Sequence, residues 1–190
     1  MSVIVAIRQG GTIYMGADTQ STAVNIRAHG LHKDNLKIKK LANGVFSCAC
    51  GRVVTLQTVY AILNNLPVLD EQGLLTKAHL VREVVPALSD CMREAGFVNG
   101  RGEMDAEFIL TYQDKGYVIF SNFSVYAIGE TFSLGAGSCA TEYALKERVD
   151  LPVRERILLA LRCSAATCDT VGAPFALVDT AKQEFEIVEA

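Results

Sequence analysis

SVIVAI (residues 2–7) and TIYMGAD (residues 12–18) are the two segments that decide how this chain folds. The first is an unbroken apolar run, which is typical of a strand buried on both faces. Gly10-Gly11 lies between the segments and is a turn signal. We therefore predict an antiparallel hairpin that brings Ser2 and Asp18 together at one end.

Outward from this hairpin, the chain alternates blocks of strands with blocks of helices. We predict strands near 36–40, 45–50, 106–112, 116–121, 124–128, 174–179 and 183–188, and helices over 53–64, 79–95, 139–148 and 153–167. Residues 19–34 are expected to be irregular or a weak strand pair, and 133–138 a loop that opens a helix. Pro86 should kink or restart its helix. Blocks in this order predict a layered α+β fold, as one domain over residues 1–190.

Composition excludes several classes of function. The chain has 190 residues, half of them hydrophobic, and a net charge of −3, so broad binding to nucleic acid or to an anionic membrane is not expected. It lacks an apolar run of about 18 residues and a signal-peptide pattern, so we predict a cytoplasmic protein. The six cysteines lack zinc-finger spacing, and no nucleotide motif occurs, so neither a metal nor a cofactor is expected.

Short motifs spread along the chain carry a family resemblance. They are, in order, Gly16-Ala17-Asp18-Thr19-Gln20, Lys37-Ile38-Lys39-Lys40-Leu41, Cys48-Ala49-Cys50-Gly51, Gly135-Ala136-Gly137-Ser138 and Cys168-Asp169-Thr170-Val171-Gly172. Together with SVIVAI they resemble proteasome-type N-terminal-nucleophile hydrolases. The likeness is to proteasome β-subunits and still more to the peptidase subunit of the bacterial ATP-dependent two-component protease. It implies a four-layer αββα sandwich with two antiparallel sheets between helix pairs.

The resemblance also implies a catalytic centre at the start of the chain. Ser2 would be the nucleophile once Met1 is removed, and its own α-amine would act as the base. Asp18 would orient the active-site lysine and the N-terminal residue. Lys37 matches that lysine by strand register, and its charge would lower the pKa of the amine and of the hydroxyl. Lys33 is the rival, because the loop before it is about three residues longer than in the family.

Three further residues receive roles from the resemblance, each beside a structural alternative. The backbone N–H of Cys48 would stabilise the oxyanion, although the family has glycine there; otherwise Cys48 is a small strand residue. Ser138 would belong to the proton network around the amine, or it caps a helix. Asp169 would hold Ser138, or it caps its own loop.

The predicted function is a proteasome-like peptidase subunit that cleaves peptide or protein substrates. The resemblance implies a homo-oligomeric ring and leaves open an ATPase partner. Two alternatives remain, namely a non-catalytic structural or assembly subunit and a small-molecule amidase or transferase. Fold alone does not choose among the three.

Overall fold

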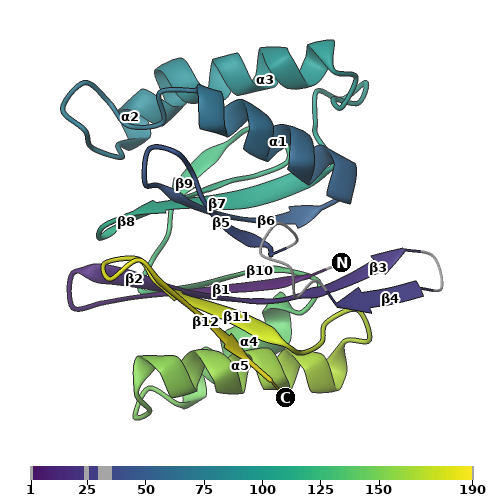
Figure 1. Cartoon of the computed structure of the whole chain (residues 1–190), viewed down its shortest axis with the longest axis vertical. Helices are drawn as coiled ribbons and strands as arrows, with labels where there is room; N and C mark the ends of the chain where they lie inside the picture. The colour runs from purple at the N-terminus through teal and green to yellow at the C-terminus, as the bar shows by residue number, and fades with distance from the viewer. Residues whose placement is uncertain (1, 24–25, 30–35, 190) are drawn as a thin grey trace. The chain divides into compact units, whose positions relative to one another are not determined.

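The computed structural model of the chain describes residues 2–23, 26–29 and 36–189. The chain forms two compact units, Met1–Ile38 with Gly129–Ala190, and Lys39–Ile128. Each unit contains a five-stranded sheet with helices against it (Figure 1).

The sheet of the first unit is built on the predicted hairpin. Strands β1 (Val3–Gln9) and β2 (Thr12–Asp18) pair in antiparallel fashion, with Ile4 opposite Ala17, so this prediction is confirmed. The other strands are β10 (Thr131–Gly135), β11 (Phe175–Asp179) and β12 (Glu184–Val188). The order across the sheet is β10-β1-β2-β11-β12.

The predicted loop over residues 133–138 is wrong in its first half. Strand β10 runs to Gly135 and pairs with β1, which places Gly135 opposite Val3. Short segments rich in glycine and serine have weak strand propensity, and here pairing with a buried neighbour overrides that local preference. A helix does open at Ser138, as expected.

Beyond Asp18 the chain forms a separate two-stranded sheet. Strands β3 (Gln20–Ala23) and β4 (Ile26–His29) pair with Ser21 opposite Ala28. Figure 1 shows this small sheet continuing past the end of β2. Of the two alternatives predicted for residues 19–34, the strand pair is therefore the one observed in the described part.

Helices α4 (Ser138–Glu147) and α5 (Val153–Thr167) cover one face of the first sheet (Figure 1). Their apolar side chains form a core with β1, which includes Val3, Val5, Ile7, Leu145, Ile157 and Leu161. Gly16 in β2 allows α5 to approach closely. A Cβ atom added there would lie 2.4 Å from Ile157 Cγ2 and 3.1 Å from Leu161 Cδ1.

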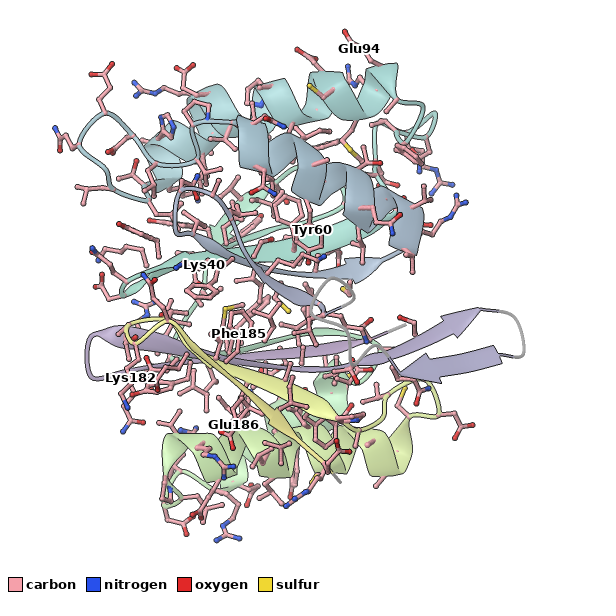
Figure 2. The ribbon with its side chains drawn as sticks, viewed as in Figure 1. Lys40, Tyr60, Glu94, Lys182, Phe185 and Glu186 are labelled. Atoms are coloured by element: carbon pink, nitrogen blue, oxygen red, sulfur yellow. The ribbon has the colours of Figure 1, made fainter. Side chains whose placement is uncertain are left out.

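The edge strand β12 has two different faces. Glu186 pairs with the guanidinium of Arg154 on α5, and the strand places Phe185 and Ile187 on the opposite face. Phe185 and Ile187 are 41% and 40% exposed. Figure 2 labels Glu186 on the side of β12 that faces α5.

The second unit repeats the plan of a sheet with helices on one face. Its strands, in their order across the sheet, are β5 (Ile38–Lys40), β6 (Phe46–Gly51), β7 (Ala106–Tyr112), β8 (Lys115–Ile119) and β9 (Val125–Ala127). The predicted strands match these within about two residues at each end, which is the usual scatter of element boundaries. The backbone turns between β5 and β6 at Gly44, whose φ is +84°.

Helix α1 (Val53–Asn65) and helix α3 (Val85–Glu94) pack on this second sheet. Figure 2 shows Tyr60 of α1 between the helix and the strands, where burial raises the pKa of its phenol. The expected helix over 79–95 is divided into α2 (Lys77–His79), a π-helical turn (Leu80–Val84) and α3. Pro86 lies in the first turn of α3, so the chain restarts its helix there, as predicted.

The predicted α+β class is confirmed, because the described residues form two five-stranded antiparallel sheets, each with helices against it, besides the small β3–β4 sheet. The description as a single domain stays a prediction. Among the helices that the structure describes, none combines the length and the apolar character that a membrane span needs.

We expect Gly16→Ala to destabilise the first unit by about 1–3 kcal/mol, because the new methyl group overlaps Ile157. Ile157→Ala removes the overlapping atom and leaves a cavity that costs about 2–5 kcal/mol by itself. In urea denaturation, the double variant should lose less free energy of unfolding than the sum of the two single losses. Strict additivity would contradict the close approach of α5 to β2.

Candidate active site

Ser2 lies directly before β1 and is only 5% exposed. Its carbonyl group packs against Gly135 of the neighbouring strand β10. A Cβ atom at Gly135 would lie 2.2 Å from the Ser2 carbonyl oxygen, and the φ of +95° there also favours glycine. Glycine at this position therefore allows the peptide group that follows Ser2 to lie against β10.

Asp18 ends β2, and its carboxyl group lies beside the same peptide group. The backbone N–H of Val3 donates to Asp18 Oδ1 at 2.9 Å. Asp18 is fully buried, and the hairpin pairing of β1 with β2 accounts for its place near Ser2. The sequence-based expectation that Ser2 and Asp18 share one end of the hairpin describes this arrangement.

Lys37 lies just before β5, and its ammonium group reaches the same carboxyl oxygen. Lys37 Nζ donates to Asp18 Oδ1 at 2.6 Å and to the backbone carbonyl of Gln20 at 2.7 Å. The side chain is 8% exposed, whereas Lys39 is partly exposed and Lys40 is exposed. A solvated strand face therefore does not describe Lys37. The rival Lys33 lies outside the described residues.

The electrostatics of this pair follow from its burial. Burial raises the pKa of the Asp18 carboxyl above its ordinary value, and this effect prevails. The charge of Lys37 and the N–H groups of Val3 and Gly172 act in the opposite direction and lower it. Within the described residues, Asp18 Oδ2 has no hydrogen-bond partner of good geometry. The ionised carboxylate therefore depends mainly on Lys37.

The structure does not join Ser138 to Asp169. Ser138 is the first residue of α4, with Gly137 at the N-cap position, and its carbonyl accepts from the hydroxyls of Ser133 and Thr141. Asp169 follows α5 and has an exposed side chain. No hydrogen bond links the two residues in this part of the described chain. Their catalytic roles stay predictions.

Cys48 belongs to the second unit. It is fully buried in the middle of β6, opposite Ile109 of β7. The alternation along β6 places it on the face opposite Ala49, which packs in the helix-side core. Its predicted role as an oxyanion N–H stays a prediction.

Sequence reasoning assigned no role to Gln20 or Gly172, which the structure brings to Asp18 and Lys37. Gln20 contributes its backbone carbonyl and Gly172 its backbone N–H. Main-chain contacts of this kind leave no signature in side-chain identity. Among the described residues, no group of three histidine, cysteine or acidic side chains could hold a metal ion.

No protein-family model matches this sequence, and no curated protein matches it. Solved structures do match, over nearly the whole chain. BPH from Thiobacillus denitrificans in complex with epoxomicin has a TM-score of 0.74 at 13% identity, and the match covers 99% of this chain and 100% of that one.

Two further structures give the same result. The Gly-1 mutant of Anbu from Hyphomicrobium sp. strain MC1 has a TM-score of 0.75 at 17% identity, over 100% of this chain and 88% of that one. Eukaryotic HslV from Trypanosoma brucei has a TM-score of 0.67 at 14% identity, over 99% of both chains. At these identities the likeness shows the fold.

The buried pair generates a prediction about stability and pH. In Lys37→Met the lowering effect of the ammonium is lost, so the pKa of Asp18 should rise further above its unfolded value of about 3.9. A carboxyl of this kind stabilises the fold at low pH, and the contribution is lost as the pH rises through the folded-state pKa. Denaturation of Lys37→Met should therefore show a free energy of unfolding that falls as the pH rises above about 4 and through the raised folded-state pKa of Asp18.

The matched control is the double variant Asp18→Asn/Lys37→Met, which has no titrating group at this place and should lack that slope. Asp18→Asn alone leaves the ammonium buried without its carboxylate and should cost about 3–5 kcal/mol. A slope that persists in the double variant would assign the pH dependence to another group.

Proposed function

Because the chain has the fold of the proteasome-like N-terminal-nucleophile hydrolases, we propose that it is a peptidase subunit with Ser2 as its nucleophile. The observation that carries the proposal is the buried Asp18–Lys37 pair, held against the peptide group that follows Ser2. Removal of Met1 is the condition for activity, since the mechanism needs a free α-amine on Ser2.

In this mechanism the α-amine of Ser2 takes the proton from the Ser2 hydroxyl. A free α-amine has a pKa near 7.7–8.0, so it can accept a proton near neutral pH. The cation of Lys37 lowers the pKa of both groups, and Asp18 keeps that cation in place. The hydroxyl oxygen then attacks the peptide carbonyl, which produces a tetrahedral intermediate.

Collapse of this intermediate breaks the peptide bond and leaves an acyl ester on Ser2. The amine returns its proton to the departing amino group, and water later hydrolyses the ester. The N–H of Cys48 is assigned to the oxyanion, and Ser138 and Asp169 to the proton network around the amine. These three assignments rest on the sequence motifs.

A burial argument favours a functional pair over a purely structural one. Taking two charges out of water costs several kcal/mol per ion, and a packed apolar pair is often at least as stable. Buried charges with a perturbed pKa cluster at functional sites. A pair at 0% and 8% exposure beside a candidate nucleophile is best explained by catalysis.

The proposed substrates are peptides, and the proposed assembly is a ring of identical subunits in the cytoplasm. The BPH neighbour is a complex with epoxomicin, so this compound is a suitable first ligand to test. Light scattering after size exclusion should give a mass that is a multiple of 20.6 kDa. An ATPase partner remains open within this proposal.

We expect Ser2→Ala to reduce peptide hydrolysis by at least about 10³-fold, because it removes the nucleophile but keeps the free amine. Ser2→Thr keeps a hydroxyl and should retain measurable turnover. Intact-mass measurement of each variant must show Met1 removed, since alanine and threonine, like serine, are small enough for that processing.

Three outcomes separate the proposed function from its alternatives. Retention of Met1 by all native molecules would exclude the mechanism and favour a non-catalytic subunit. Turnover of small amides without turnover of any peptide would favour a small-molecule amidase. Unchanged peptide hydrolysis in Ser2→Ala would show that Ser2 is not the nucleophile.

A further inference from the structure

Gln20 connects the active-site lysine to a distant loop. Its backbone carbonyl accepts a hydrogen bond from Lys37 Nζ at 2.7 Å. Its side-chain Nε2 donates to the backbone carbonyl of Asp169 at 3.0 Å, across 149 positions of sequence. The residue is 3% exposed; its bond to Lys37 is buried and its bond to Asp169 is partly buried.

The loop that receives this bond follows α5 and carries Asp169. It is a short turn in which the N–H of Cys168 donates to Ser164 and the N–H of Val171 donates to Cys168. The Asp169 side chain itself is exposed, and a surface carboxylate is not placed by packing. A fixed position for Asp169 therefore has to come from the backbone of the loop, and Gln20 binds that backbone at Asp169 itself.

The residues before Gln20 hold other parts of the same region. The N–H and the hydroxyl of Thr19 both donate to the carbonyl of Pro174, next to β11. That contact extends the pairing of β2 with β11, so it belongs to the sheet. The contact of Gln20 is different, because its side-chain amide donates to the Asp169 loop while its own backbone carbonyl accepts from Lys37.

We propose that Gln20 is a positioning residue of the Ser2 site, which fixes Lys37 through its carbonyl and the Asp169 loop through its amide. This inference rests on the proposed function. Gln20 thus connects Lys37 and Asp169, two residues with proposed catalytic roles that lie far apart in the sequence. Loss of the Gln20 amide should make the loop that carries Asp169 more mobile. It should also weaken the hydrogen bond between Lys37 and the Gln20 carbonyl.

The test replaces Gln20 by methionine, which keeps the length of the side chain and removes the donor. The matched control is Thr12→Val at the other end of β2, which removes a buried hydroxyl that contacts Thr180 at 3.3 Å. Both variants lose a buried side-chain hydrogen bond, so both should lower the melting temperature by a few degrees, on the order of 5 °C. Only Gln20→Met should alter the site.

In Gln20→Met we expect kcat to fall about 10-fold or more while KM changes by less than about 3-fold. The acid limb of kcat/KM should move to higher pH, because a cation near the α-amine lowers its pKa and displacement of Lys37 relaxes that effect. Hydrogen exchange of the peptide covering 168–172 should accelerate in this variant and not in Thr12→Val.

The outcomes separate this inference from the proposed function. Full activity in Ser2→Ala overturns the proposed function, whatever Gln20 does. Inactive Ser2→Ala together with unchanged kcat and an unchanged pH profile in Gln20→Met overturns the role of Gln20 alone. If the wild type hydrolyses none of the tested peptides, hydrogen exchange tests the role of Gln20. Unchanged protection of residues 168–172 in Gln20→Met then overturns the coupling between Gln20 and the Asp169 loop.

Discussion

A lysine ammonium buried against an aspartate carboxylate is the interaction on which the rest of the first unit depends. Desolvation opposes it, and the 2.6 Å contact between Lys37 and Asp18 exists because the backbone supplies further partners to both groups. Val3 donates to the carboxylate, and Gln20 accepts from the ammonium. The start of β1, the end of β2, the start of β3 and the segment before β5 are therefore held by one charged centre.

The sequence was sufficient for features that local pattern encodes. The apolar run after Ser2 and the double glycine predicted the hairpin, whereas the choice of Lys37 by motif register as the active-site lysine stays a prediction. Strand β10 was missed, because its last residues run into the small-residue stretch 135–138, which masks the strand pattern of Thr131–Leu134, and its pairing with β1 is not visible in local sequence. The link from Gln20 to Asp169 was missed because no periodicity relates residues so far apart. The role of Cys48 stays untested, because it depends on geometry that pattern does not supply.

Backbone N–H and carbonyl groups form a large part of the candidate site. The N–H groups of Val3 and Gly172 and the carbonyls of Gln20 and Asp169 take part directly. The close packing of the Ser2 carbonyl on Gly135 belongs to the same pattern. A site of this kind tolerates exchange of many side chains, provided that the strands keep their register.

The edge strand β12 has a consequence for handling the purified protein. Its alternation of glutamates with half-exposed Phe185 and Ile187 puts charge on an edge that is otherwise open to pairing with another strand. The hydrogen-bonded Arg154 lowers the pKa of Glu186, so this charge persists into mild acid. In stronger acid Glu186 loses this charge, and an edge strand that carries exposed apolar side chains is then a better template for aggregation. Storage near neutral pH therefore preserves the protection that β12 provides.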